Sequence, residues 1–266
     1  MPEGDTVWLT AQRLDAALAG RPLVRADLRV PQLATVRLEG RRVLEVTPRG
    51  KHLLTRLDGG MTLHSHLRMD GAWHLYAPGE RWRGGAEHQV RAVLANADRT
   101  AVGYRLPVLE LLPTADEAQV VGHLGPDLLG PGWDPAAALA RLAAGPERPV
   151  GEALLDQRNL AGIGNVYAAE LCFLRGVTPW TPYGEVAAPE KLVVLAKRLL
   201  EANKARPGHV TTGDTRRGRT HWVYDRAHRP CLRCGTQVRG GEHGPAGQRR
   251  VAYWCPSCQR GPVPAG

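Results

Sequence analysis

The first residues of the chain have types that could carry chemistry. The sequence begins Met1-Pro2-Glu3, and a proline in second position is a favourable context for removal of the methionine. Pro2 would then present a free secondary amine, and α-amino groups have a pKa of about 7.7–8.0, so part of the population is neutral near pH 7. Such an amine can attack an aldehyde or sugar carbon to form a cationic iminium, with Glu3 as proton donor or acceptor. The alternative is an ordinary frayed terminus.

Four cysteines near the other end form a second group. They occur as two Cys-x2-Cys pairs with 20 residues between them: Cys231, Cys234, Cys255 and Cys258. Four thiolates at this spacing suit one structural Zn²⁺ in tetrahedral coordination, and the metal would supply the stability that so short a module lacks. The intervening segment favours a β-hairpin with Arg249 and Arg250 at its tip. The fifth cysteine, Cys172, lies among apolar residues and is predicted to be a buried core thiol.

The composition of the whole chain narrows the possible partners. The 266 residues suit two domains or two plus a small module, and the formal net charge is +9. Only four of the 35 basic residues are lysines, and arginine suits phosphate and guanine contacts, although a GC-rich genome would produce the same bias. No apolar run approaches the ~20 residues of a membrane span, and no signal peptide is apparent. We therefore expect a cytoplasmic protein with nucleic acid as its partner.

The elements that must position these groups follow from periodicity and turn residues. A helix is expected over residues 6–19, with Asp5 or Thr6 as its cap. Short β-rich runs then predict an antiparallel sandwich or barrel: Val43–Val46, His52–Leu57, Met61–Leu67, Trp73–Tyr76, Val90–Leu94 and Thr100–Tyr104. In the third run, Leu63, Ser65 and Leu67 should face the core, which leaves His64 and His66 on the other face.

Beyond a Gly- and Pro-rich linker at residues 125–135, the pattern becomes helical. The predicted helices are Ala136–Ala144, Leu154–Asn159, Val166–Arg175 and Lys191–Arg206. Gly162-Ile163-Gly164-Asn165 precedes the third helix, where unpaired amides could face an anion. The arginine-rich segment 208–229 is either a disordered connection or a loop that faces nucleic acid.

Four pieces together resemble the formamidopyrimidine-DNA glycosylase / endonuclease VIII family of base-excision-repair enzymes. They are Pro2-Glu3, the run Arg49-Gly50-Lys51-His52-Leu53-Leu54, the run from Leu154 through Gly162-Ile163-Gly164-Asn165 to Glu170, and the four-cysteine finger with Gln248-Arg249-Arg250. The resemblance covers essentially the whole chain. It implies an α+β fold with an N-terminal antiparallel β-sandwich and flanking helices (1–124), a linker (125–135), a helix-two-turn-helix domain (136–222) and a zinc β-hairpin finger (223–262).

The resemblance also implies roles for individual residues. Pro2 would be the nucleophile at C1′ of the damaged nucleotide, Glu3 would assist ring opening, and Lys51 would act beside the sugar and its phosphate. Asn165 and Arg250 would hold phosphates, and Met69 would fill the gap left by a flipped base. The implied partner is damaged DNA, bound by a monomer with one structural Zn²⁺, no small-molecule cofactor and no membrane, in the bacterial cytoplasm at the nucleoid.

Departures from the family pattern bear on the substrate. Many members begin Pro-Glu-x-Pro-Glu, whereas Asp5 and Thr6 stand at the last two places here. The Arg-x-Phe wedge of the formamidopyrimidine branch has no counterpart in residues 96–101, and Phe173 is the only phenylalanine. That favours the endonuclease VIII branch and oxidised pyrimidines, although Met69 in His66-Leu67-x-Met69-x-Gly71 resembles the purine branch. Two alternatives stay open: an oxidised-purine glycosylase, and a non-catalytic zinc-ribbon protein that binds lesions or nucleic acid.

Overall fold

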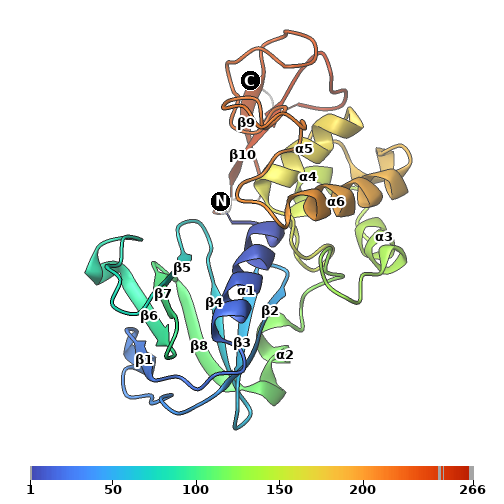
Figure 1. The fold of residues 1–266 in the computed structure, drawn as a ribbon. Helices are drawn as coiled ribbons and strands as arrows, with labels where there is room; N and C mark the ends of the chain where they lie inside the picture. Colours follow the sequence, from blue (N-terminus) through green and yellow to red (C-terminus); the bar gives the residue numbers. More distant parts are fainter. Residues whose placement is uncertain (1, 245–246, 248, 264–266) are drawn as a thin grey trace. The chain divides into compact units, whose positions relative to one another are not determined.

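The computed structural model describes residues 2–244, 247 and 249–263. The chain divides into two compact units, Met1–His123 (unit 1) and Leu124–Gly266 (unit 2). Unit 1 contains an antiparallel β-sandwich with a long helix, and unit 2 contains helices and a hairpin that carries the cysteine pairs (Figure 1). The predicted α+β class is confirmed.

Two four-stranded antiparallel sheets form the described part of the sandwich in unit 1, in the orders β1-β6-β7-β5 and β2-β3-β4-β8. The strands are β1 (Arg25–Leu28), β2 (Val43–Arg49), β3 (His52–Leu57), β4 (Met61–His66), β5 (Ala72–Tyr76), β6 (Val90–Ala95), β7 (Thr100–Tyr104) and β8 (Val108–Pro113). Leu53, Leu63 and Leu109 from the second sheet and Leu94 from the first are buried in one core between the sheets. Alternation along each strand explains this, because every second residue points to the same face.

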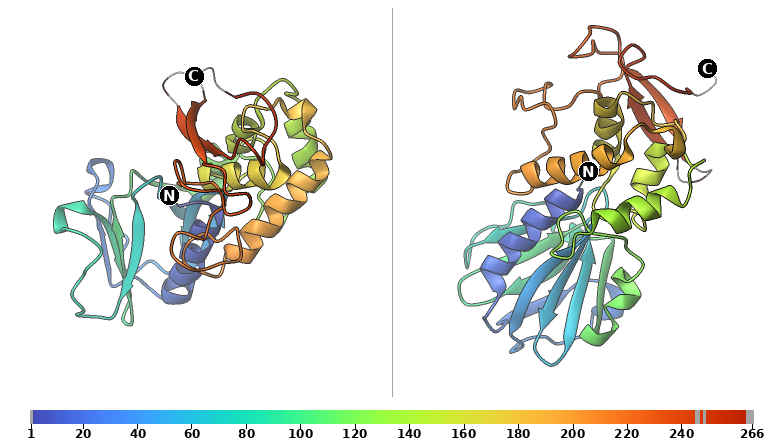
Figure 2. Two further views of the ribbon diagram at one scale, coloured as in Figure 1. Left: turned by 90° about the horizontal axis from the view of Figure 1, so that it is seen from above. Right: turned by 90° about the vertical axis from the view of Figure 1, so that its right-hand side faces the viewer.

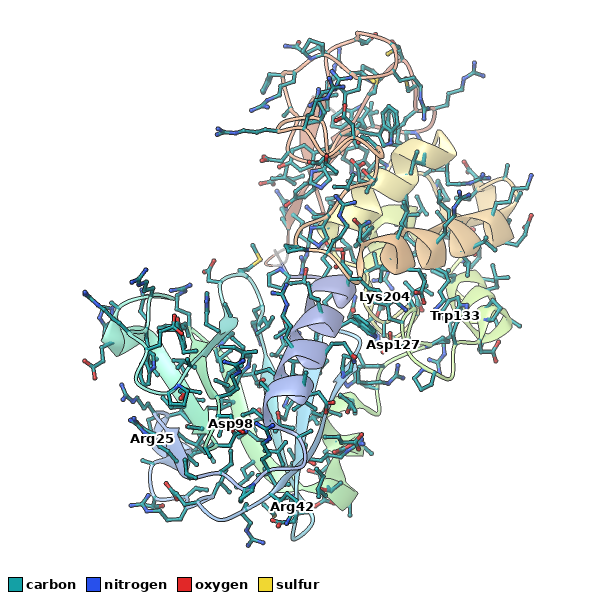
Figure 3. All side chains as sticks on the ribbon, in the orientation of Figure 1. Arg25, Arg42, Asp98, Asp127, Trp133 and Lys204 are labelled. Atoms are coloured by element: carbon teal, nitrogen blue, oxygen red, sulfur yellow. The ribbon has the colours of Figure 1, made fainter. Side chains whose placement is uncertain are left out.

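Helix α1 (Gly4–Leu18) adds its apolar stripe to that core through Val7, Ala11, Leu14 and Leu18. It packs beside β2, where the Asp15 carboxylate accepts a hydrogen bond from the Val46 amide at 2.7 Å. At the C-terminal end of α1, Arg42 donates to the Gly20 carbonyl at 3.2 Å; Figure 3 shows Arg42 far from the start of the helix.

Several sequence predictions in unit 1 need correction. Helix α1 begins at Gly4, with Glu3 at the N-cap position, so the expected cap at Asp5 or Thr6 is wrong. Strands β1 and β8 were not predicted. The run Arg-Ala-Asp-Leu of β1 lacks the β-branched and aromatic residues that mark a strand, and its pairing with β6 places it in the sheet. Short 3-10 turns lie between β1 and β8 at Pro31–Leu33 and Glu87–Gln89, and a third, at Thr114–Asp116, follows β8 and precedes the short helix α2 (Ala118–Val121).

Unit 2 is built on α3 (Pro135–Ala143), α4 (Val150–Leu155), α5 (Asn165–Arg175) and α6 (Pro189–Asn203), with a 3-10 turn at Tyr183–Glu185. The predicted helix Leu154–Asn159 is wrong in position. Asp156 takes an extended conformation and binds Arg148 and Arg158 through its carboxylate, so α4 ends at Leu155. The Gly- and Pro-rich segment before α3 is packed rather than loose: Leu128 is buried, and Asp127 (labelled in Figure 3) forms a bridge to Ala161.

The hairpin of β9 (Arg239–His243) and β10 (Arg250–Trp254) completes unit 2. Strand β10 lies beside α5, as both views of Figure 2 show. Part of the hairpin tip, including Gln248, lies outside the described residues. Within the part of the chain that is described, no helix is long and apolar enough to cross a membrane.

Candidate functional site

Pro2 and Glu3 lead directly into the first turn of α1. Pro2 is half-buried, and Glu3 is fully buried in the extended conformation of an N-cap residue. The first amides of a helix carry partial positive charge, so both residues lie at an end that favours anions. Met1, whose removal would free the Pro2 amine, lies outside the described residues.

Lys51 lies in the tight turn between β2 and β3, at the same end of unit 1. Arg49 pairs with His52, so Gly50 and Lys51 form a two-residue turn. Gly50 has φ +57°, a left-handed conformation that strains residues with a side chain, and this explains the glycine before the lysine. Since Asp15 contacts Val46 while Gly20 contacts Val43, the start of α1 runs toward the Arg49–His52 turn. The structure thus brings Pro2, Glu3 and Lys51 to one end of unit 1.

A group of histidines lies beside Lys51 on the outer face of the β2-β3-β4-β8 sheet. His52 pairs in register with His66, and its Nδ1 lies 2.8 Å from Nε2 of His64. The His123 ring centroid is 6.1 Å from that of His52. The prediction that His64 and His66 lie on the face opposite the core is confirmed. Ser65 faces inward, where its hydroxyl accepts a hydrogen bond from the Trp73 indole at 3.3 Å.

Two of these histidines, His52 and His66, are held neutral by their surroundings. Burial lowers the pKa of His52 to about 3, with repulsion from the neighbouring histidines and Lys51 adding to the effect. Burial, then the charge of Lys51, lowers the pKa of His66 to about 4. With these two imidazoles neutral near pH 7, Lys51 and Arg68 carry positive charge next to them.

Met69 lies on the short loop at residues 67–71, which follows β4 and is called the Met69 loop below. Its side chain is 58% exposed, which is unusual for methionine. The loop is tight: the Gly71 amide donates to the Leu67 carbonyl at 2.8 Å, and the Arg68 amide donates to Nδ1 of His66 at 2.9 Å. An exposed apolar side chain on an ordered loop is suited to insertion between bases.

In unit 2, Asn165 is the first residue of α5 and is buried, with 7% of its surface exposed. The preceding glycine turn is shaped by Gln157, whose side chain donates to the Leu155 and Ile163 carbonyls, both at 2.8 Å, and accepts from the Gly162 amide at 3.0 Å. Gly162 has φ +110° and could not be replaced without strain. The Asn165 amide donates to the Val251 carbonyl at 2.9 Å.

That contact joins the start of α5 to strand β10, whose first residue is Arg250. Arg250 is exposed, and the adjacent Arg249 binds Glu242 at 3.0 Å. The predicted hairpin is confirmed. The Asn165 side chain is therefore bonded to Val251, the residue next to Arg250 in the strand.

The four cysteines of the two pairs converge. Their sulfur atoms all lie within 4.8 Å of one another, with Cys231 and Cys258 at 4.0 Å and Cys234 and Cys255 at 3.5 Å. A tetrahedral ion with Zn–S bonds of about 2.3 Å requires sulfur–sulfur separations of roughly 3.8 Å. The cluster can therefore bind one metal ion and fits a zinc finger. Cys172 is fully buried in α5, as predicted, and burial raises the pKa of its thiol to about 12.

Glu170 is a functional candidate that sequence reasoning quoted but gave no role. Its carboxylate is fully buried and accepts hydrogen bonds from the amides of Trp222, Val223 and Tyr224 at 2.8–2.9 Å and from the Thr211 hydroxyl. The arginine-rich segment is thus ordered on α5. These hydrogen bonds join Glu170 to residues far along the chain, and no local motif in a single sequence indicates such a contact.

Two family models match most of the chain. Residues 1–105 match the formamidopyrimidine-DNA glycosylase N-terminal domain, and residues 124–202 match the formamidopyrimidine-DNA glycosylase H2TH domain. The second match confirms that the fold includes a helix-two-turn-helix domain.

Curated relatives match over nearly their full length. A probable endonuclease 8 2 of Streptomyces coelicolor is 65% identical over 99% of this chain and 96% of its own. The DNA-(apurinic or apyrimidinic site) lyase Nei2 of Mycolicibacterium smegmatis is 50% identical over 97% of this chain and 99% of its own. Endonuclease 8 of Escherichia coli is 32% identical over 97% of this chain and 100% of its own.

Solved structures share the fold. A complex of Lactococcus lactis Fpg with DNA containing an abasic site superposes with a TM-score of 0.78 at 22% identity, over 97% of this chain and 100% of that one. The MutM (Fpg) protein from Thermus thermophilus gives a TM-score of 0.77 at 30% identity, over 98% of this chain and 100% of that one.

Proposed function

The chain belongs to the formamidopyrimidine-DNA glycosylase / endonuclease VIII family, and we propose that it is a bifunctional DNA glycosylase and AP lyase whose nucleophile is Pro2. The enzyme acts on damaged DNA in base excision repair. The observation that carries the residue assignment is the convergence of Pro2, Glu3 and Lys51 at one end of unit 1.

The chemistry assigned to Pro2 follows from its secondary amine. The nitrogen forms a bond to C1′ as the glycosidic bond breaks, and the damaged base leaves with a proton. Glu3 donates a proton to the ring oxygen, so that the sugar opens to an iminium. Loss of the C2′ proton then expels the 3′ phosphate, a second elimination expels the 5′ phosphate, and water hydrolyses the iminium to regenerate Pro2.

Lys51 and three further residues are assigned to holding the DNA. Lys51, presented by the Gly50 turn beside neutral histidines, binds the phosphate next to the lesion and acts as an acid at the sugar. Asn165 and Arg250 bind phosphates, which fixes the strand without reading its sequence. Met69 occupies the space of the flipped nucleotide.

The metal in the cysteine cluster is proposed to be a single structural Zn²⁺. All four thiolates would be ligands, which leaves no open position for substrate or water. Its contribution is to hold the β9–β10 hairpin and thereby Arg250. We also assign the protein to the bacterial cytoplasm, at the nucleoid, as a monomer.

The preferred substrates are proposed to be oxidised pyrimidines, because the relatives with 50% identity or more are named as endonuclease 8 or AP lyase proteins. The test compares 5′-labelled duplexes that carry thymine glycol, 8-oxoguanine or an abasic site under single-turnover conditions. We expect cleavage of the abasic strand to a 3′-phosphate end by β,δ-elimination, and faster excision of thymine glycol than of 8-oxoguanine. Faster excision of 8-oxoguanine would establish the purine alternative, and tight binding with no product would establish the non-catalytic binder.

A further inference from the structure

Arg105, the residue directly after β7, contacts the Met69 loop. Its Nε donates to the carbonyl of Asp70, the residue after Met69, at 3.1 Å. The contact follows from the register of the sheet, because Ala72 at the start of β5 pairs with Tyr104. Arg105 is thus joined to the loop that carries the exposed methionine.

The same guanidinium is fixed from its other side by Gln89. Nη1 of Arg105 donates to Oε1 of Gln89 at 2.8 Å, and the Arg105 amide donates to the Gln89 carbonyl, also at 2.8 Å. Oε1 of Gln89 accepts in addition from the Ala86 amide at 3.2 Å. A planar guanidinium that donates from both Nε and Nη1 has a defined orientation, which a single ammonium group would lack.

The backbone at Arg105 provides an independent observation. Arg105 has φ +48°, in the left-handed region where residues with a side chain are strained and glycine is preferred. A Cβ at Gly85 would lie 2.5 Å from Oε1 of Gln89 and 2.8 Å from Nη1 of Arg105, so Gly85 lies against this bonded pair. An arginine in a left-handed position, with a side chain that bonds two other segments, indicates that the side chain has a role.

We propose that Arg105 is a positioning residue for the Met69 loop, which it holds in the conformation that lets Met69 enter the base stack when a nucleotide is flipped out. This inference rests on the proposed function. Together with the Gly71–Leu67 and Arg68–His66 hydrogen bonds, the Asp70 contact fixes the loop at its start, at its end and beside Met69. A fixed wedge enters the duplex without first losing conformational freedom.

The test uses R105G, which removes the side chain and relieves the left-handed strain, so the fold is retained. R105K keeps the charge but replaces the planar guanidinium, which donates from Nε to Asp70 and from Nη1 to Gln89, with a single ammonium group. R83A is the matched control for lost charge, because Arg83 lies on the neighbouring loop and only its backbone amide makes a described bond, to the Tyr76 hydroxyl. Two substrates separate insertion from chemistry: a lesion in duplex DNA, which requires base flipping, and an abasic site in a single strand, which does not.

We expect R105G and R105K to slow single-turnover cleavage of the duplex lesion by roughly tenfold or more and to reduce the fluorescence rise of 2-aminopurine placed beside the lesion. Borohydride trapping on the single-stranded abasic site should match wild type, and R83A should match wild type on both. M69A combined with R105G should be no slower than the slower single variant. Equal rates for R105G and wild type on the duplex, equal losses on both substrates, or additive effects with M69A would each overturn the inference. Absence of trapping by the wild-type protein would instead refute the proposed function.

Discussion

The side-chain amide of Asn165 donates a 2.9 Å hydrogen bond to the carbonyl of Val251, the residue that follows Arg250 in strand β10. One residue in the first turn of α5 is therefore bonded to the start of β10 in the β9–β10 hairpin, next to Arg250. The two residues proposed to contact phosphates in unit 2, Asn165 and Arg250, are therefore linked by this hydrogen bond. A substitution at one should change the contribution of the other to DNA binding.

Energetic coupling between Asn165 and Arg250 is the first expected consequence. Arg250→Ala should weaken binding to all DNA alike and reduce the slope of log K against log salt by about 1, as for one lost phosphate contact. In an Asn165→Ala background the same change should cost less, by about 0.5–3 kcal/mol, because the strand is no longer held. Fluorescence anisotropy with an abasic-analogue duplex at several salt concentrations measures both. Arg239→Ala, at the other end of the hairpin, is the control. If Arg250→Ala and Asn165→Ala were coupled no more strongly than Arg239→Ala and Asn165→Ala, the connection would be contradicted.

Glu170→Gln should loosen the arginine-rich segment. The fully buried carboxylate accepts from three backbone amides and a hydroxyl, and a neutral amide with its own donors cannot replace it. We expect a loss of about 2–3 kcal/mol in the free energy of unfolding and faster trypsin cleavage after Arg216 and Arg217, which are exposed. Glu185→Gln, at an exposed position, should leave both unchanged. Unaltered cleavage in Glu170→Gln would show that the segment is held by other contacts.

Stability should fall as the pH drops below about 6.5. The pKa of His52 is lowered to about 3 and that of His66 to about 4, chiefly by burial, whereas histidine in the unfolded chain has a pKa near 6.5. Between these values the unfolded chain binds more protons, so folding is favoured above pH 6.5 and weakened below it, by about 1 kcal/mol per pH unit for each histidine.

Urea unfolding at pH 7.5 and at pH 5 measures this loss, and His52→Gln should show a smaller one. Staying at pH 5 or higher avoids titration of the Asp156 carboxyl, whose pKa is lowered mainly by hydrogen bonds from Arg158. His88→Gln, at an exposed position, should lose as much stability as wild type. An identical pH dependence in His52→Gln and wild type would rule out His52 as a source.

Removal of the metal should abolish DNA binding through loss of the hairpin. Metal analysis should find one zinc per chain, and its release by a chelator should track the loss of affinity, because four converging thiolates without a metal do not hold the β9–β10 hairpin. Cys258→Ser should lose zinc, whereas Cys172→Ala, in the core of α5, should keep one zinc per chain. Full DNA affinity in zinc-free protein would contradict the structural role.

Local pattern was enough to predict the parts of the molecule that depend on short-range chemistry. Strands His52–Leu57 and Thr100–Tyr104 were predicted with their correct ends because alternation and flanking turns mark them. The cysteine cluster was predicted because the ligand spacing itself encodes the hairpin. Position of the first helix was less accurate, since buried Glu3 lacks the short polar side chain that normally marks an N-cap.

Features that depend on pairing between residues distant in the chain could not be predicted from the sequence. The His52–His64–His66 group depends on the register between β3 and β4. The Arg105–Asp70 contact depends on the pairing of β5 with β7 and on the left-handed backbone conformation of Arg105, which no sequence motif predicts. Helix α4 was misplaced because Asp156 is drawn away from helical geometry by two arginines. In each case, a contact distant in sequence decides the local structure.

The assignment of Pro2 as nucleophile is tested most directly by borohydride trapping on an abasic-site duplex, followed by mass spectrometry of the adduct. The account predicts a single reduced adduct on Pro2 of a chain that lacks Met1. Pro2→Gly should trap far less while it still binds the duplex. An adduct on Lys51 or another amine, or no adduct from a chain with a confirmed free Pro2 and intact DNA binding, would contradict it.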